Sequence, residues 1–317
     1  MSNKKIKILI SASPFCEHNS KPIDMLKKNN ISYDLNPKGR KLTENEILNM
    51  ISSYDGIIAD IEPLNKKVLA KSKNLKIISR VGIGVNNIDL KYAKKKKIVI
   101  SNTPDAPTPA VVELNLGLIF ALIRNVFIHN IELKKGNWKR LVGLRLPFLK
   151  IGILGLGRIG SSLANKLLKI GCKKIFYNDL KKKRINSNII FKSKDYIFKN
   201  CDLLCLTLPE TIKTKNFLNK KIFKKMKKQS FIINTSRGEL INEKDLLDFL
   251  NKGYFSGVAL DVFNKEPYRG KLIDFNRCIL TPHVGSHTID CRNKMELEAT
   301  QDLINFFKNK PIINKVN

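Results

Sequence analysis

The sequence predicts an α/β protein built from two doubly wound parallel-sheet domains. Three observations carry this prediction. Short apolar runs alternate with helical segments along nearly the whole chain, as buried parallel strands and their crossover helices do. The length of 317 residues suits two domains better than one. The stretch "NTPDAPTPA", residues 102–110, interrupts the alternation with three prolines and is a candidate hinge.

The first hundred residues carry the first series of strands and helices. A capping box is expected to begin one helix, because Glu46 follows Thr43 by three residues. The expected strands are the apolar runs at residues 5–11, 56–60, 76–82 and 98–102. The expected helices lie at residues 20–30, 43–54, 63–73 and 89–97.

A second series follows the hinge and opens with one long helix at roughly 108–134. Its expected strands lie at residues 150–154, 174–178, 202–206, 230–234, 256–260 and 278–281. A final amphipathic helix at 288–310 can join the first series. We therefore predict one domain from residues 1–102 plus 286–317, and a second domain, residues 103–285, inserted into it.

The composition indicates a soluble, cytoplasmic protein. No apolar run reaches the ~20 residues of a membrane-spanning helix, and the closest, 111–123, contains Glu113 and Asn115. The N-terminus lacks the apolar core and cleavage site of a signal peptide. The six cysteines show no metal-binding spacing, and free buried thiols in a reduced cytosol are expected.

A net charge of +32 raises the question of an anionic partner. Its lysine runs, at 94–97, 181–184 and 224–228, fall in different loops and helix ends, without interleaved aromatic residues. Nucleic acid is therefore not expected as a partner. The positive field could still raise the encounter rate with anionic small molecules. The sequence offers no physical reason for so much lysine.

A glycine loop, "GLGRIG" at residues 155–160, lies between the strand "IGIL" and a helix. Gly155 permits a tight turn, Gly157 lets a pyrophosphate approach bare backbone, and Gly160 lets the helix pack close to the strand. The helix N-terminus offers unpaired N–H groups to the phosphates. With this context the loop predicts a Rossmann-type dinucleotide site rather than a glycine turn without a ligand.

The next strand ends at Asp179, nineteen residues after Gly160. A carboxylate there would accept hydrogen bonds from the adenosine ribose and repel a 2′-phosphate, which favours NAD over NADP. The basic run at 181–184 leaves NADP open, since it could receive a phosphate if the loop curls back.

Further motifs point to a family. They are "SRVGIGVNNIDL" (79–90), "INTSRGELINEKDL", "GVALDVFNKEP" and "LTPHVGSHT". With the glycine loop, this set resembles the D-isomer-specific 2-hydroxyacid dehydrogenases, above all the phosphoglycerate dehydrogenase-like branch, over nearly the whole chain and in the same order. The resemblance implies a Rossmann-type cofactor domain inserted in a flavodoxin-like substrate domain, an NAD cofactor and a homodimer.

The resemblance assigns three catalytic residues. His283 matches the histidine that exchanges a proton with the substrate oxygen, a task suited to a group that titrates near neutral pH. Glu266 matches the acid that orients this ring and favours the imidazolium. Arg237 matches the arginine that binds the substrate carboxylate and polarises the keto oxygen, for which a planar fork of donors is suited.

Other residues are assigned to binding in the same way. Asp261 resembles the residue that holds the nicotinamide carboxamide, and Val81, Gly82 and Ile83 resemble the loop that holds the substrate carboxylate. The remaining matches to cofactor-binding positions are Arg158, Ile159, Pro209 and Thr214. His287, four residues after His283, does not suggest a metal pair, because a hinge separates the two rather than one helix turn.

The resemblance makes D-3-phosphoglycerate, oxidised to 3-phosphohydroxypyruvate in serine biosynthesis, the leading substrate. Asp60 departs from this branch, many members of which carry arginine there, near where a substrate phosphate would sit. Arg40, Lys38 or a lysine from another subunit could supply the positive charge instead. Glyoxylate/hydroxypyruvate reductase is therefore the alternative. The chain stops at residue 317, so feedback through a C-terminal regulatory domain is not expected. A hypothesis from another class is a corepressor-like protein that binds NAD as a sensor. Enzymatic turnover would distinguish the dehydrogenase from such a sensor. The physiological direction stays open.

Overall fold

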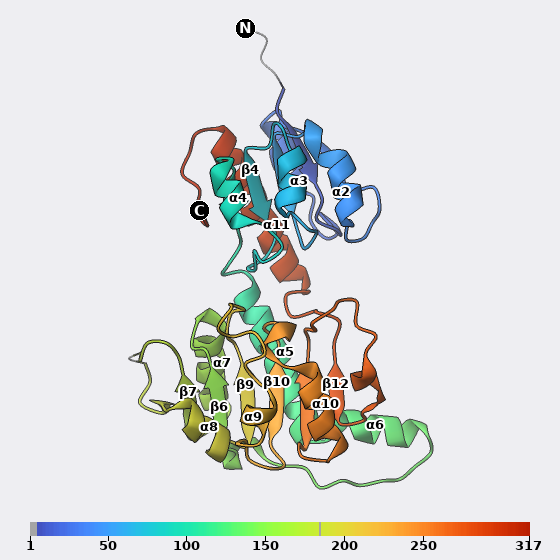
Figure 1. Ribbon diagram of the computed structural model, residues 1–317, viewed down its shortest axis with the longest axis vertical. Coiled ribbons are helices and arrows are strands. Elements are labelled where there is room, and N and C mark those ends of the chain that lie inside the picture. The colour runs from blue at the N-terminus through green and yellow to red at the C-terminus, as the bar shows by residue number, and fades with distance from the viewer. Residues whose placement is uncertain (1–4, 184) are drawn as a thin grey trace. The chain divides into compact units, whose positions relative to one another are not determined.

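The computed structural model describes residues 5–183 and 185–317, in two compact units (Figure 1). One unit holds the chain up to Pro107 together with Ser286–Asn317, and the other is Thr108–Gly285. The chain first passes from one unit to the other after residue 107, whereas the predicted boundary lay after residue 102. Thr103 explains the difference, because its N–H donates to the carbonyl of Gly82 (3.0 Å) and keeps this stretch in the first unit. Arg184, in the predicted basic run, lies outside the described residues.

The first unit is built on a five-stranded parallel sheet of order β2-β1-β3-β4-β5. This is the flavodoxin-like doubly wound order, which reverses between β1 and β3. Sequence analysis missed β2, because it is a polar strand at the edge of the sheet and shows no apolar run. The strands are β1 (Lys7–Ile10), β2 (Ser32–Leu35), β3 (Gly56–Ala59), β4 (Ile77–Arg80) and β5 (Val99–Ser101).

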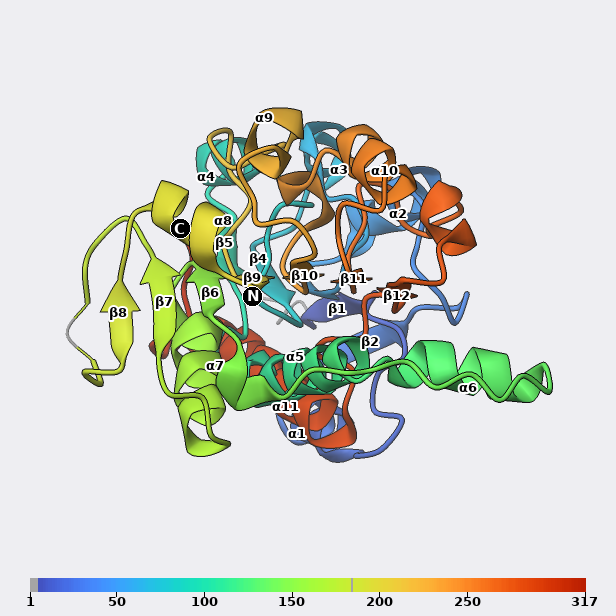
Figure 2. The same cartoon turned by 90° about the horizontal axis from the view of Figure 1, so that it is seen from below.

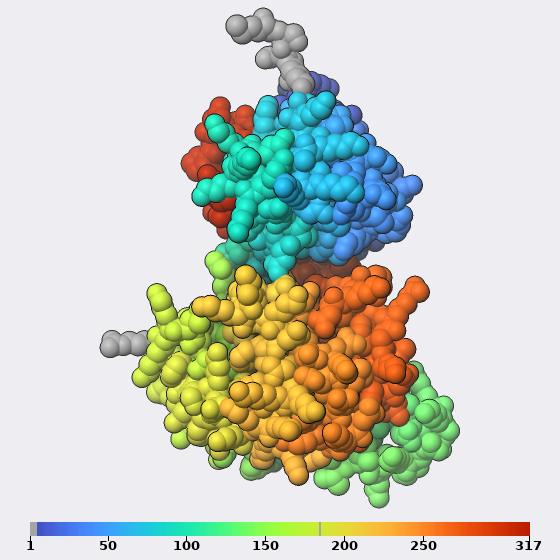
Figure 3. Space-filling model, viewed as in Figure 1, coloured from blue at the N-terminus to red at the C-terminus, as the bar shows by residue number. Residues whose placement is uncertain are grey.

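The helices of this unit include one from the far end of the chain. The last helix packs against β4, where the hydroxyl of Ser79 donates to the carbonyl of Ala299 (2.7 Å). The predicted capping box at Thr43 and Glu46 is confirmed. The helices are α1 (Lys21–Lys28), α2 (Glu44–Met50), α3 (Lys66–Lys71), α4 (Leu90–Lys95), α11 (Ile289–Phe307) and the 3₁₀ turn η1 (Ile51–Ser53). The space-filling view shows the two chain ends, blue and red, sharing the surface of this unit (Figure 3).

The second unit is built on a seven-stranded parallel sheet of order β12-β11-β10-β9-β6-β7-β8. This is the Rossmann order with one added strand, and it reverses between β6 and β9. The six predicted strands are confirmed, whereas the short edge strand β8 was missed. The strands are β6 (Ile151–Leu154), β7 (Ile175–Asn178), β8 (Ile189–Phe191), β9 (Leu203–Leu206), β10 (Phe231–Asn234), β11 (Gly257–Leu260) and β12 (Cys278–Leu280).

The predicted single helix at 108–134 is wrong. Two helices replace it, bent by 62° at a break where Asn125 adopts a left-handed conformation (φ 53°). Asparagine tolerates this conformation better than most residues. The helices of the second unit are α5 (Pro107–Ile123), α6 (Val126–Lys134), α7 (Arg158–Lys169), α8 (Lys194–Asn200), α9 (Lys220–Phe223), α10 (Glu243–Asn251) and the 3₁₀ turns η2 (Leu146–Phe148), η3 (Gly238–Leu240) and η4 (Lys271–Asp274).

Helix α5 is buried on several sides and contributes to the apolar core beside β6, where Val112, Ile119 and Ile123 join Ile151 and Ile153. Helix α6 instead projects away from the sheet (Figure 2). Among the described residues, no single helix has the length and apolarity needed to cross a membrane, and only the bent pair α5 and α6 would qualify together.

All six cysteines are free thiols, and five of them are buried. Burial raises the pKa of the Cys201 and Cys278 thiols to about 12, so both stay protonated at neutral pH. Within the described part of the chain, no three His, Cys, Asp or Glu side chains are grouped to hold a metal ion.

Candidate active site

The predicted site residues of the second unit follow the carboxyl ends of its strands. Since these strands are parallel, their carboxyl ends meet at one edge of the sheet, where ligands of doubly wound folds bind. The positions are Gly155, Gly157, Arg158, Ile159 and Gly160 after β6, Asp179 after β7, Pro209 and Thr214 after β9, Arg237 after β10, Asp261 and Glu266 after β11, and His283 after β12.

The three glycines of the loop after β6 differ in what a side chain would meet at each position. Gly155 has φ +92°, and a side chain there would also approach the Thr207 carbonyl oxygen. A methyl group at Gly160 would lie 2.1 Å from the Gly155 carbonyl oxygen. Apart from its chain neighbours, no heavy atom of the described residues lies within 4 Å of a methyl group at Gly157. The fold therefore requires Gly155 and Gly160, while Gly157 presents bare backbone to open space.

Helix α7 begins directly after this open backbone. Gly157 occupies the N-cap position and has no side chain to cap the first N–H groups. Arg158 is exposed and Ile159 packs partly into the core, so the first turn is anchored on one side. The twelve-residue helix thus offers a partial positive charge and unpaired donors to an anion. The loop fits the pyrophosphate of a dinucleotide.

The carboxylate of Asp179 is bound to the glycine loop. It accepts hydrogen bonds from the backbone N–H groups of Leu156 (2.8 Å) and Leu180 (2.6 Å). Lys183 Nζ lies 3.5 Å from Asp179 Oδ2 and donates to the Leu156 carbonyl. Lys183 of the basic run therefore lies against the loop, where it partly neutralises the acid that would repel a 2′-phosphate.

The loop after β9 is tied to its neighbours. Thr214 Oγ1 donates to the Pro209 carbonyl (2.8 Å) and accepts from the Thr211 N–H (2.7 Å), which closes a short turn. Thr207 Oγ1 donates to the Gly155 carbonyl (2.5 Å). The hydroxyl of Ser236 donates to the Leu208 carbonyl. These contacts join the glycine loop, the Pro209 turn and the Arg237 loop along the sheet edge.

Asn234 positions the loop that carries Arg237. This buried residue ends β10, accepts from the Ser236 N–H through Oδ1 (3.0 Å) and donates to the Arg237 carbonyl through Nδ2 (2.7 Å). The Arg237 side chain donates to the Ser236 carbonyl (2.6 Å). Sequence analysis missed Asn234, although a polar residue at the end of an apolar strand was a visible signal.

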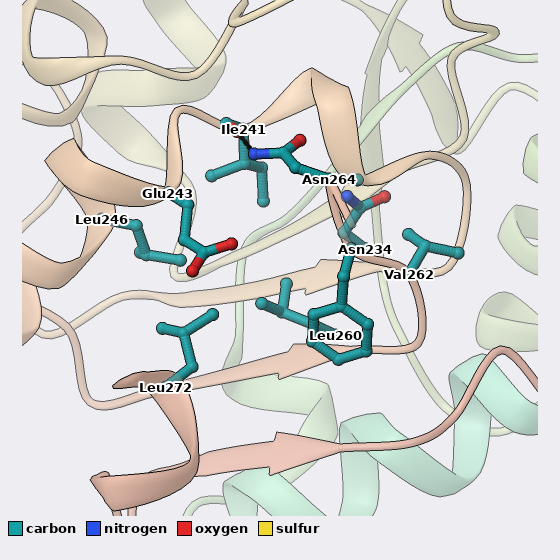
Figure 4. Close-up of a pocket in the computed structure, with 10 residues that line it drawn as sticks. Asn234, Ile241, Glu243, Leu246, Leu260, Val262, Asn264 and Leu272 are labelled. Atoms are coloured by element: carbon teal, nitrogen blue, oxygen red, sulfur yellow. Dashed lines mark hydrogen bonds between the residues drawn. The ribbon is translucent and has the colours of Figure 1, made fainter. Parts of the chain in front are cut away.

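The Arg237 loop packs closely on the loop after β11. A methyl group at Gly238 would lie 2.0 Å from the carbonyl carbon of Phe263, so only glycine allows this approach. Both loops contribute to the lining of a small, mainly apolar cavity, which Leu260 and Val262 also line (Figure 4). On its rim, Asn264 donates to the Ile241 carbonyl (3.5 Å). The loops that carry Arg237 and Glu266 are therefore packed against each other and against the same cavity.

His283 and Glu266 form a pair across neighbouring loops. His283 Nδ1 lies 2.9 Å from Glu266 Oε2, and the other carboxylate oxygen accepts from the Phe263 N–H (3.0 Å). His283 has φ 56°, an uncommon conformation for a residue other than glycine and one often found at functional sites. Its side chain is 41% exposed. The ring is therefore oriented by a carboxylate and accessible to a ligand.

Asp261 holds the loop that carries His283 through hydrogen bonds. Its buried carboxylate accepts from the Thr281 hydroxyl (2.5 Å) and from the backbone N–H groups of Val284 (2.9 Å) and Gly285 (2.8 Å). Burial raises the pKa of this carboxyl, and the three hydrogen bonds oppose the rise. The carboxylate thus has a structural role in this loop, beside its predicted role at the cofactor.

Replacing Asp261 with alanine is expected to lower the free energy of unfolding by about 1–3 kcal/mol, because the buried N–H of Gly285 and the partly buried N–H of Val284 lose their acceptor. Urea unfolding at neutral pH measures this change. Asp274→Ala, which removes an exposed carboxylate of the same unit, is the control and should change stability little. Equal stabilities of the two variants would contradict this role.

The predicted carboxylate loop belongs to the first unit. Gly82 has φ +129°, and its N–H donates to Thr103 Oγ1 (2.7 Å). The Val81 N–H donates to the Ala59 carbonyl (2.8 Å), and Asn102 Nδ2 donates to the Ile83 carbonyl (2.8 Å). Asn102 and Thr103, which sequence analysis considered only as part of a hinge, therefore fix the backbone of this loop.

Comparison with known proteins identifies the family. Residues 116–285 match the family described as "D-isomer specific 2-hydroxyacid dehydrogenase, NAD binding domain". The hydroxypyruvate reductase of Thermotoga maritima is 33% identical over 277 residues, which are 85% of this chain and 90% of that protein. The chain belongs to the D-isomer specific 2-hydroxyacid dehydrogenase family.

Other members of the dehydrogenase family differ in length. The D-3-phosphoglycerate dehydrogenase of Synechocystis is 31% identical over 284 residues, 87% of this chain, but the chain spans only 51% of that protein. The crystal structure of the TT0316 protein from Thermus thermophilus superposes with a TM-score of 0.90 at 28% identity, covering 98% of this chain and all of the other. The two-domain fold and the NAD cofactor follow, and this dehydrogenase is an NAD-dependent oxidoreductase.

Proposed function

We propose that this dehydrogenase interconverts a D-2-hydroxy acid and its 2-keto acid, with His283, Glu266 and Arg237 as its catalytic residues. The His283–Glu266 pair, at 2.9 Å on neighbouring loops of an NAD-binding sheet, carries the proposal. A half-exposed imidazole held by a carboxylate suits proton exchange near neutral pH. A pure NAD sensor would have no need of this pair together with an arginine on the adjacent loop.

The proton follows a defined route in this proposal. Since Glu266 engages Nδ1, the opposite ring nitrogen of His283, Nε2, takes the hydroxyl proton during oxidation and returns it during reduction. Glu266 stabilises the imidazolium that forms. A bound NAD would supply the acceptor for the hydride that leaves carbon 2 of the acid. Carbon 2 thereby becomes a carbonyl carbon, and the proton and hydride balance the reaction.

Arg237 binds the carboxylate of the acid and polarises its carbonyl oxygen. The Asn234 clamp holds the backbone of this arginine, and the planar guanidinium offers two parallel donors to a carboxylate. The loop of Val81, Gly82 and Ile83 is proposed, by resemblance to the family, to bind a substrate carboxylate as well; the N–H groups of Val81 and Gly82 already donate to the Ala59 carbonyl and to Thr103 Oγ1.

The carboxyl edge of the seven-stranded sheet would hold the cofactor. Gly157, Arg158 and Ile159 would receive the pyrophosphate at the start of α7, and Asp179 would accept hydrogen bonds from the adenosine ribose. Pro209 and Thr214 would contact the cofactor, and Asp261 would hold the nicotinamide carboxamide. The open space at Gly157 supports the phosphate position most directly.

NADH oxidation with purified protein tests this function. Phosphohydroxypyruvate, hydroxypyruvate and glyoxylate are offered in parallel, with NADPH as a second cofactor. A preference for phosphohydroxypyruvate would support 3-phosphoglycerate as substrate and a place in serine biosynthesis. A preference for the other two acids would support a hydroxypyruvate or glyoxylate reductase. Cofactor binding without turnover of any acid would contradict the proposal and favour a sensor.

A homodimer is the assembly proposed for this dehydrogenase. The segment 126–148 contains α6, which projects from its unit (Figure 2). The segment exposes large apolar side chains, and exposed apolar patches mark interaction surfaces. These side chains are Val126, Phe127, Leu133, Trp138, Val142, Leu144 and Phe148.

Light scattering is expected to give twice the chain mass of 36.1 kDa for the wild-type protein. Trp138→Glu should shift the protein toward the monomer, because it places a charge in the apolar segment. Ile313→Glu, at an exposed apolar residue outside the segment, should leave the mass unchanged. A monomeric wild-type protein would contradict the dimer.

A further inference from the structure

Two arginines and one carboxylate form a cluster in the first unit. Asp60 directly follows β3, Arg80 ends β4, and Arg292 lies on α11. Asp60 Oδ1 lies 3.7 Å from Arg80 Nη2, and Asp60 Oδ2 lies 3.7 Å from Arg292 Nη1. Each arginine side chain is only 11% exposed. Asp60 therefore sits between two largely buried guanidinium groups.

This cluster occupies a position at which doubly wound sheets bind ligands. The strand order of the five-stranded sheet reverses between β1 and β3, and Asp60 follows the carboxyl end of β3. The Arg80 guanidinium folds onto the predicted substrate loop, because a methyl group at Gly82 would lie 1.5 Å from its Nη1. The cluster thus borders the loop proposed to hold the substrate carboxylate.

An open hollow adjoins the cluster, and Arg292, Glu296 and His287 help to line it. His287 follows the proposed catalytic His283 by four residues. The hollow belongs to the same unit as the cluster and the predicted substrate loop.

The positive charge of the cluster is already matched. Arg292 Nη2 lies 2.9 Å from Glu296 Oε1, and this buried carboxylate also accepts from the Cys16 N–H (2.9 Å). Asp60 and Glu296 thus balance Arg80 and Arg292. A further carboxyl, that of Glu62, is buried beside them and accepts from the Ser11 hydroxyl and the Asp60 N–H. The described carboxylates beside Arg80 and Arg292 thus already face both guanidinium groups.

We propose that Asp60 is an internal counter-ion that occupies the anion-binding capacity of Arg80 and Arg292, so that the substrate carries no anionic group besides its carboxylate. This inference rests on the proposed function and selects its substrate class. Short 2-keto monocarboxylates such as hydroxypyruvate and glyoxylate meet the requirement. A phosphorylated acid would bring its second anion against a carboxylate.

The ratio of kcat/KM for phosphohydroxypyruvate to that for hydroxypyruvate tests this proposal. The wild-type protein should favour hydroxypyruvate. Asp60→Asn should raise the ratio by about tenfold or more, because it removes one repulsive charge near the phosphate. The double variant Asp60→Asn/Arg292→Gln should lose most of this gain, since the guanidinium that faced Asp60 from α11 is then absent.

Asp34→Asn is the matched control. It removes the carboxylate of another ion pair of the first unit, at 2.7 Å from Lys7 Nζ, and raises the net charge equally. Its ratio should equal that of the wild type. A wild-type preference for phosphohydroxypyruvate would overturn the inference while supporting the proposed function, and this measurement does not depend on the folding of any variant. An unchanged ratio in a folded Asp60→Asn protein would also overturn it. Turnover of none of the acids would refute the proposed function and this inference with it.

Discussion

Replacing His283 with alanine is expected to lower kcat by roughly 10²- to 10⁴-fold, the usual contribution of a positioned general acid–base. Cofactor binding should persist, because the glycine loop after β6 and Asp179 lie on other strands of the sheet. Steady-state kinetics measure the loss, and titration of NADH fluorescence measures the dissociation constant of the cofactor. Unchanged turnover would refute the assignment of His283.

The Glu266→Gln variant separates two proposed roles of Glu266, which are to orient the His283 ring and to place a negative charge beside it. Glutamine can still hydrogen-bond to His283 Nδ1, but it removes the negative charge that favours the imidazolium. We therefore expect a smaller loss of kcat than in His283→Ala, together with a displaced pH–rate profile. A profile identical to that of the wild type would show that Glu266 does not act through the charge of His283.

Two glycine variants should separate cofactor binding from folding. Gly157→Ala is expected to weaken NADH binding on the order of tenfold or more, because its methyl group enters the space proposed for the pyrophosphate. The backbone at Gly157 (φ −72°) suits alanine, and the space around it is open, so the melting temperature should change little.

Gly160→Ala is the matched variant three residues later. Its methyl group would lie 2.1 Å from the Gly155 carbonyl oxygen, so the backbone of the loop must shift. Overpacking of this kind typically costs about 1–3 kcal/mol. We expect both a lower melting temperature and weaker NADH binding. If Gly157→Ala also lowered the melting temperature, or left NADH binding intact, the proposed phosphate position would be wrong.

The parts of the fold that the sequence predicted are those with a local signal. Buried parallel strands are short apolar runs, and six of the seven strands in the Rossmann sheet appear as such runs. The missed strands, β2 and β8, lie at sheet edges. Strand β2 is polar, and β8, although apolar, is only three residues long. The break at Asn125 was missed because apolar residues continue on both sides of it.

The residues of the candidate site likewise divide into those that a sequence motif predicted and those that only the structure revealed. Residue types at strand ends, such as the glycine loop, Asp179 and His283, belong to motifs that are contiguous in the sequence. The supports of these residues come from elsewhere. Asn234 clamps Arg237 only because the chain turns back at the end of β10, and Asp261 holds the His283 loop through strand pairing of β11 with β12.

The sequence by itself determined the family, the alternation of strands and helices, and the chemical groups available for hydride-transfer chemistry. Only the tertiary structure decided the environment of Asp60. Its two arginine partners come from the next strand of the sheet and from the last helix, which packs across that sheet. Charge balance depends on distances between side chains far apart in the chain, and no local pattern encodes those distances.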